Sequence, residues 1–367
     1  MNDTNQTSEA DTKVRGVAGG KSQAYANLES YAYWYWEVHP YLSLIVCTFG
    51  IATNIVNIVI LTRKKMLSSI NTILTGIAIS DIVTMMEYLP YALHFYILTD
   101  IDDLTKRHTF GWSTYLVVHS CLSNTTHTIS IWLGVCMAIV RYIFIRSKGN
   151  SRWNLDIYKA CILVAVVYLL SVVVFIPNYM TTEVQPSFHE ASNTTIYRIK
   201  NLEIYLKNTS ILNAVNVWIF ITVGKIVPCC LITIFGGLLL RTLQESRKLA
   251  ENLKGSSFTE RIQQHKRTTS MLLAIIAMFI LAELPSGILA VVSVFVEDFF
   301  MSYYLLVADT LDIVSLLNNA VNFVMYCSMS RQFRECLCEM ILNMCNKKAR
   351  TRDYRAVSNK TTQISAV

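Results

Sequence analysis

The chain has 367 residues, of which 53% are hydrophobic and only 16% are charged, and its formal net charge is +7. Soluble domains carry roughly 25% charged residues, so this composition excludes an ordinary soluble globular protein. With only 13 glycines and 6 prolines, the chain also lacks the composition of a fibrous or disordered protein.

Apolar runs long enough to cross a bilayer, about 20 residues each, recur seven times along the chain. The second, third and seventh runs also contain polar residues, spaced to face the interior of a helix bundle. The runs cover residues 38–62, 71–98, 113–145, 156–178, 211–243, 267–296 and 301–327.

These runs predict an all-α membrane protein with a seven-transmembrane helix bundle. Residues 1–37 form an amino-terminal tail, residues 38–328 form the transmembrane domain, and residues 329–367 form a short amphipathic eighth helix followed by a tail. Most of the 32 Lys and Arg residues fall in the loops on one side and in the final tail. By the positive-inside rule that side is cytoplasmic, which predicts a multi-pass plasma-membrane protein with an extracellular amino terminus. The basic inner face suits anionic membrane lipid or a cytosolic protein partner, and nucleic-acid binding is not expected.

Sequons and cysteines add predictions about modification. Glycosylation is predicted in the outer segments, at Asn2, Asn5, Asn193 and Asn208. None of the ten cysteines falls in an outer loop, so we expect no extracellular disulfide. Cys336 and Cys338 lie in the amphipathic segment just after the last span and are candidates for palmitoylation.

Several short motifs stand in a fixed order on successive spans. They are GIATNIVNIVIL, NTILTGIAISD, VRY at 140–142, Pro228, Pro285, NFVMY at 322–326 and SRQFRE. In this order the chain resembles rhodopsin-like (class A) G-protein-coupled receptors. The further segments VHPYLSLIVCTFG, AELPSG and SLLNNAVNF are similar to the invertebrate myosuppressin receptors and their FMRFamide-like relatives.

The resemblance implies a receptor for an amidated neuropeptide, and no enzymatic activity. Its partners would be a heterotrimeric G protein, of the inhibitory Gi/o type, and arrestin. Arg141, Tyr142 and Tyr326 would form the G-protein-coupling surface. The chain departs from the family pattern at Val140, where an acid usually precedes the arginine, and at Phe323, where proline is usual.

The resemblance also implies a polar centre made by Asp81, Ser130, Asn318 and Asn322, which in the wider family is a sodium- and water-filled site. A carboxylate with hydroxyl and amide oxygens can replace the hydration shell of a hard cation. The alternative is a hydrogen-bonded packing network without an ion. No other cofactor is expected.

Glu283 lies in the middle of the sixth span, where a charge costs about 2.5–3.5 kcal/mol on insertion scales. It therefore either belongs to a structural network or contacts a ligand. In the fifth span, Lys225 either snorkels towards the membrane surface or pairs with an acid of a neighbouring helix, and contact with the ligand is the alternative.

Together with Glu283, the predicted ligand-binding residues are Asp312, Glu87, Tyr91, His127, Trp218 and Asp309. An Arg-Phe-amide terminus would find carboxylates for its guanidinium and aromatic walls for its ring. For His127, a hydrogen-bonding role in helix packing is the alternative.

Two other functions compete with the peptide receptor. One is a chemosensory receptor for a small molecule, against which the acidic and aromatic outer half argues. The other is a membrane transporter, whose inverted repeats and paired broken helices are not evident in this sequence.

Overall fold

We analysed a computed structural model of the chain. The structure describes residues 23–100, 102–147, 155–199, 211–252, 256–296, 298–343 and 345. The predicted glycosylation sites Asn2, Asn5 and Asn208 lie outside these residues.

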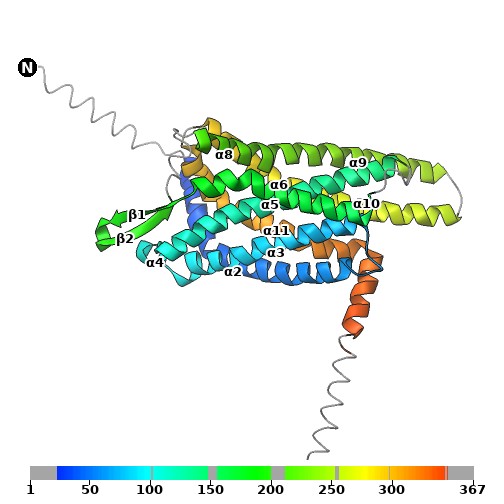
Figure 1. Cartoon of the computed structure of the whole chain (residues 1–367), viewed down its shortest axis with the longest axis horizontal. Coiled ribbons are helices and arrows are strands. Elements are labelled where there is room, and N and C mark those ends of the chain that lie inside the picture. The colour runs from blue at the N-terminus through cyan, green and yellow to red at the C-terminus, as the bar shows by residue number, and fades with distance from the viewer. Residues whose placement is uncertain are drawn as a thin grey trace, which may run out of the picture.

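Seven long helical spans lie side by side in one bundle (Figure 1). Within the described ranges, seven helices are long and apolar enough to cross a membrane, which confirms the predicted fold class. A further helix, residues 331–343, leaves the bundle at one end (Figure 1). The spans are formed by α2 (Gln23–Leu61), α3 (Ser69–Ala92), α5 (Phe110–Arg146), α6 (Ile157–Thr181), α8 (Ile211–Ile221) with α9 (Val227–Asn252), α10 (Ser256–Phe295) and α11 (Leu305–Met329).

The first helix begins at Gln23 rather than at residue 38, where the apolar run starts. No glycine or proline interrupts residues 23–39, so the helix continues beyond the apolar run. Its added turns also pack against other spans, since the hydroxyls of Tyr31 and Thr310 are hydrogen-bonded at 2.9 Å. The ring of Tyr35, which is buried, stacks on Tyr31.

A β-hairpin that the sequence did not predict connects α6 to the next span. It pairs β1 (Val184–His189) with β2 (Thr194–Ile199) in antiparallel register and projects past one end of the bundle (Figure 1). The exposed Asn193 sits at its turn with a φ of 51°, a left-handed conformation that asparagine tolerates. We call this end of the molecule the hairpin end. The short helix α4 (Leu104–Arg107) lies there too.

Three π-helical segments interrupt the spans in the half nearer the hairpin end. They are η1 (Leu93–Leu98), η4 (Thr222–Ile226) and η5 (Phe300–Tyr304). A π turn leaves local carbonyl groups without their usual α-helical donors. In η4 a side chain from another helix satisfies one of them, because Nε1 of Trp132 in α5 donates to the carbonyl oxygen of Val223 at 3.0 Å.

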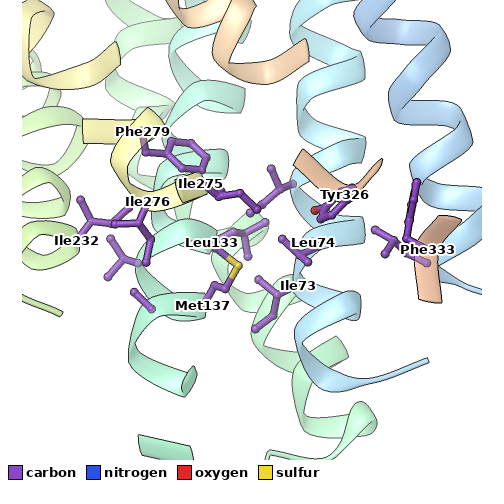
Figure 2. Close-up of a cluster of buried hydrophobic side chains, with 14 of the residues drawn as sticks. Ile73, Leu74, Leu133, Met137, Ile232, Ile275, Ile276, Phe279, Tyr326 and Phe333 are labelled. Atoms are coloured by element: carbon purple, nitrogen blue, oxygen red, sulfur yellow. The ribbon is translucent and has the colours of Figure 1, made fainter. Parts of the chain in front are cut away.

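The main hydrophobic core lies in the half of the bundle away from the hairpin. Figure 2 shows part of this core. Phe279 of α10, Leu133 of α5 and Tyr326 of α11 meet there, and Phe333 joins them from the helix at 331–343. Phe333 is 0% exposed, so burial of this ring docks the eighth helix onto the bundle.

The same packing bears on the predicted acylation sites. Cys336 is only 2% exposed and belongs to this core, so its thiol is not presented to the surface. Cys338, on another face of the same helix, is exposed. The structure therefore leaves Cys338 as the accessible member of the predicted pair.

Candidate functional site

Glu283 lies in a buried ion pair. Its side chain is 0% exposed, and its Oε2 is 2.8 Å from Nζ of Lys225 in η4. Nε2 of His127, in α5, lies 2.6 Å from the same oxygen. Ser315 of α11 donates from its hydroxyl to Oε1 at 3.5 Å. The prediction that Lys225 pairs with an acid of a neighbouring helix is confirmed, and Glu283 is that acid.

Local backbone structure brings this pair together. Lys225 sits in the π-helical turn η4, which alters the direction its side chain takes from the fifth span. Across from it, α10 carries Gly287, at which an added Cβ would lie 3.5 Å from Cβ of Lys225. A Cβ at this position would be in ordinary van der Waals contact with Lys225, so the two helices lie close together here, and the ammonium reaches Glu283, one turn earlier in α10.

A second cluster, the acid–tyrosine cluster, lies between α2, α3, η1 and α11. Asp309 is buried and accepts hydrogen bonds of 3.0 Å at both oxygens from the hydroxyl of Tyr96. Nε2 of His39 lies 3.9 Å from Oδ1 of Asp309 and 3.0 Å from the hydroxyl of Tyr88. The Tyr91 hydroxyl is 3.2 Å from that of Tyr96. Asp309 therefore orders tyrosines rather than facing open space.

Glu87 and Asp312 belong to the same cluster but differ in availability. Glu87 is paired with Nδ1 of His119, whose ring stacks on Tyr91 at 4.2 Å between centroids. Asp312 is exposed, and its Oδ2 accepts only a long hydrogen bond of 3.5 Å from Tyr88. Among the residues that the structure describes, Asp312 forms no ion pair. It is the acid of this cluster that remains open to a cation.

A cavity of about 310 Å³ lies between α5, α6, α8, α10 and η5, and its lining residue Phe220 contacts Lys225 of the ion pair. Its lining is mainly apolar, and it includes neutral polar side chains such as Asn124, Asn178 and Asn216. Nδ2 of Asn216 donates to Oδ1 of Asn178 at 3.0 Å, which joins α6 to α8. None of the predicted ligand-binding residues lines this cavity. The sequence signal for this cavity is the presence of asparagines inside the apolar fourth and fifth spans.

Trp218, one of the predicted ligand-binding residues, does not line this cavity. It is 48% exposed and packs edge-to-face on the exposed ring of Phe295, whereas its neighbours Val217 and Phe220 line the cavity.

The polar centre is assembled largely as predicted. Ser130 donates to Oδ1 of Asp81 at 2.9 Å, and Asn322 donates to Oδ2 at 3.2 Å. Asp81 is 0% exposed, and Asn318 is buried one turn before Asn322. In the part of the chain that the structure describes, Asp81 has no basic partner. A buried carboxylate surrounded by hydroxyl and amide groups is a donor set that fits a sodium ion.

The three predicted coupling residues lie in the half of the bundle away from the hairpin. Arg141 is buried, and its guanidinium lies 5.5 Å from the ring centre of Phe144. Tyr142 contacts Phe235 of α9 edge-to-face. Tyr326 is buried against Phe333 at 5.2 Å between ring centroids (Figure 2).

Comparison with known proteins places this architecture in a family. The family model of serpentine type seven-transmembrane G-protein-coupled receptor (GPCR) chemoreceptors, Srw, matches residues 41–344. The G-protein coupled receptor dmsr-1 of Caenorhabditis elegans is 32% identical, covering 86% of this chain and 70% of that protein. The sex peptide receptor of Drosophila melanogaster is 24% identical, with coverages of 88% and 76%. The FMRFamide receptor of the same fly is 23% identical, with coverages of 79% and 51%.

A solved structure supports the fold independently. The crystal structure of squid rhodopsin superposes with a TM-score of 0.62 at 15% identity, covering 84% of this chain and 86% of that one. The family match extends over most of the chain, which rules out the transporter and any enzymatic reading. The chain belongs to the serpentine seven-transmembrane G-protein-coupled receptors of the Srw family, and is a class A-like signalling receptor.

Proposed function

We propose that the protein is a receptor for a neuropeptide with an amidated carboxyl terminus and an arginine close to it, and that it activates a heterotrimeric G protein of the Gi/o type. Two similar receptors are named for peptides, the sex peptide receptor and the FMRFamide receptor. The single observation that carries the proposal is the open carboxylate of Asp312 among tyrosines.

Asp312 would receive the arginine of the peptide. A guanidinium binds a carboxylate through two parallel hydrogen bonds, and aromatic faces attract it further. Tyr88 and Tyr91 supply such rings beside Asp312. Asp309 and Glu87 already have partners, so in this proposal they hold the tyrosines and His119 in place.

Binding would act at a distance on the opposite end of the bundle. A ligand shifts the equilibrium towards the state it binds better. In that state α10 pivots near Pro285, and its inner end moves outward to admit the G protein beside Arg141, Tyr142 and Tyr326. Arrestin would use the same inner face.

The proposal includes the membrane setting and a sodium ion. The hairpin end would be extracellular in the plasma membrane, with Asn193 glycosylated and Cys338 palmitoylated on the inner side. Asp81, Ser130, Asn318 and Asn322 would hold the ion. When bound, it would supply the positive charge that the buried carboxylate of Asp81 otherwise lacks.

The test is a cAMP assay in cells that express the receptor, with amidated peptides each paired with its free-acid form. We expect at least one Arg-containing amide to suppress forskolin-stimulated cAMP in a pertussis-toxin-sensitive manner. Suppression that survives the toxin would overturn the Gi/o assignment. If no peptide changes cAMP in cells whose surface receptor has been verified, the peptide assignment is overturned.

A small-molecule chemosensory receptor is the second candidate, because the matching family model is described as one of chemoreceptors. The cavity of about 310 Å³ is large enough for a small organic ligand. Saturable activation by a small molecule, in a receptor that answers no peptide, would favour this candidate.

A further inference from the structure

The ammonium of Lys225 lies behind the side chains that form the floor of the cavity. Phe220 lines the cavity, and its ring centre lies 5.9 Å from Nζ of Lys225. On α10, Ala290 also lines the cavity, one turn from Gly287, which faces Lys225. Lys225 therefore lies directly behind the cavity wall, and its side chain is only 10% exposed.

Glu283 cancels that charge. The carboxylate is completely buried and lies 2.8 Å from the ammonium, and no other acid forms an ion pair with Lys225 among the described residues. The polar groups that face the cavity are neutral amides and hydroxyls, including those of Asn178, Asn216 and Ser293. The pair thus gives the cavity a neutral lining and a neutral floor.

Such a cavity favours a peptide that ends in a carboxamide over one that ends in a free carboxylate. A carboxamide both donates and accepts hydrogen bonds, so asparagine side chains can satisfy it. A carboxylate would be buried without a counter-charge, which is costly. At about 310 Å³ the cavity is at the small end of ligand pockets and suits one terminal residue, whose aromatic ring would pack on Phe175 and Phe220.

We infer that Glu283 is a positioning residue for ligand specificity, which makes the receptor select an amide-capped over a free-acid terminus by neutralising Lys225 behind the cavity wall. This inference rests on the proposed function and extends it to the chemical group that the cavity binds. Without the charge of Glu283, the ammonium of Lys225 would attract a terminal carboxylate past Phe220.

The experiment compares four receptors: wild type, Glu283→Gln, Lys225→Met and the double variant Glu283→Gln with Lys225→Met. The probes are FMRFamide and the same peptide as free acid. For each receptor the surface level, the binding affinity of both peptides and the amide-to-acid affinity ratio are measured. The double variant is the matched control, because it also removes the ion pair but takes away one charge of each sign and so leaves the net charge of the cluster unchanged.

We expect Glu283→Gln to lower the amide-to-acid ratio about tenfold or more, since an uncompensated ammonium behind the wall attracts the free-acid terminus and not the neutral amide. The double variant should recover the wild-type ratio, and Lys225→Met should raise it. A general loss of packing would reduce both affinities and leave the ratio unchanged.

An unchanged ratio in Glu283→Gln at normal surface level overturns the inference. Since Glu283→Gln leaves a buried cation unpaired, it can fail to reach the surface. In that case Lys225→Met decides, and a ratio at or below the wild-type value overturns the inference. If FMRFamide does not bind the wild type, the amide that suppresses cAMP in the assay above replaces it, together with its free-acid form. If no amide binds the wild type, the proposed function fails, and the inference fails with it. Binding of the amide together with an unchanged ratio in the variants removes the inference alone.

Discussion

The hydroxyl of Ser113, near the start of α5, donates a hydrogen bond of 2.6 Å to the carbonyl oxygen of Tyr197 in β2. The amide of Tyr197 in turn donates to the carbonyl oxygen of His108 at 2.9 Å. Ile199, at the end of the same strand, lines the cavity. Since all ten cysteines are free, hydrogen bonds rather than a disulfide attach the hairpin to α5.

This attachment predicts that ligand binding is insensitive to reducing agents. Dithiothreitol should leave the affinity for FMRFamide unchanged, because it has no bond to break here. Ser113→Ala should lower the affinity a few-fold, in keeping with the roughly 1 kcal/mol that a hydrogen bond contributes. Thr114→Ala is the control, since that hydroxyl bonds only within its own helix. Loss of binding in dithiothreitol would contradict the prediction.

The role of Asp312 can be tested with a pair of peptides. Asp312→Asn should weaken binding of an Arg-containing amide at least tenfold, because a charge-assisted pair is lost. A peptide with neutral citrulline in place of arginine should bind wild type weakly and lose little more in the variant. Equal losses for both peptides would show that Asp312 acts through the fold. Exposed Asp100→Asn controls for the general effect of removing an acid.

A sodium ion at Asp81 would stabilise the ligand-free receptor. We expect sodium chloride, but not choline chloride, to raise the Tm of the detergent-solubilised protein by roughly 2–4 °C. Asp81→Asn should abolish this difference because it removes the only carboxylate of the polar centre. Equal Tm values in the two salts for the wild type would identify the centre as a packing network.

Docking of the eighth helix depends on one ring. Phe333→Ala removes a fully buried aromatic side chain and should destabilise the protein by about 3–5 kcal/mol, visible as a lower Tm. Leu342→Ala on the same helix should have little effect, since Leu342 is 62% exposed. A comparable Tm loss in both variants would contradict the prediction, because Leu342 is exposed and its removal leaves no cavity.

The spans and the polar centre were predictable for physical reasons. A helix that crosses the membrane needs about 20 apolar residues whatever the other helices do, so hydropathy alone finds the spans. The polar centre was predicted from the resemblance to the receptor family. The motif positions transferred correctly because Asp81, Ser130 and Asn322 lie on regular α-helical stretches, where 3.6 residues per turn keep the same face buried.

Other features depended on contacts that a single sequence does not reveal. The partner of Glu283 could not be chosen from the sequence, because the π turn that positions Lys225 is not visible in hydropathy. The hairpin strands lie in a polar loop and are stabilised by pairing with each other and with α5. The buried position of Cys336 follows from the docking of Phe333, which is a tertiary contact.

The π turn in the fifth span divides that helix into two parts whose registers are independent. Deleting one residue between Thr222 and Ile226 would convert the turn to ordinary α-helix and swing the segment before it by about 100°. A different set of side chains would then face the ligand, while the stretch after Pro228 would keep its alignment with the signalling machinery. Deletion of one residue at this turn is therefore a route by which receptors of this kind can change the ligand they bind while their coupling to the G protein stays the same.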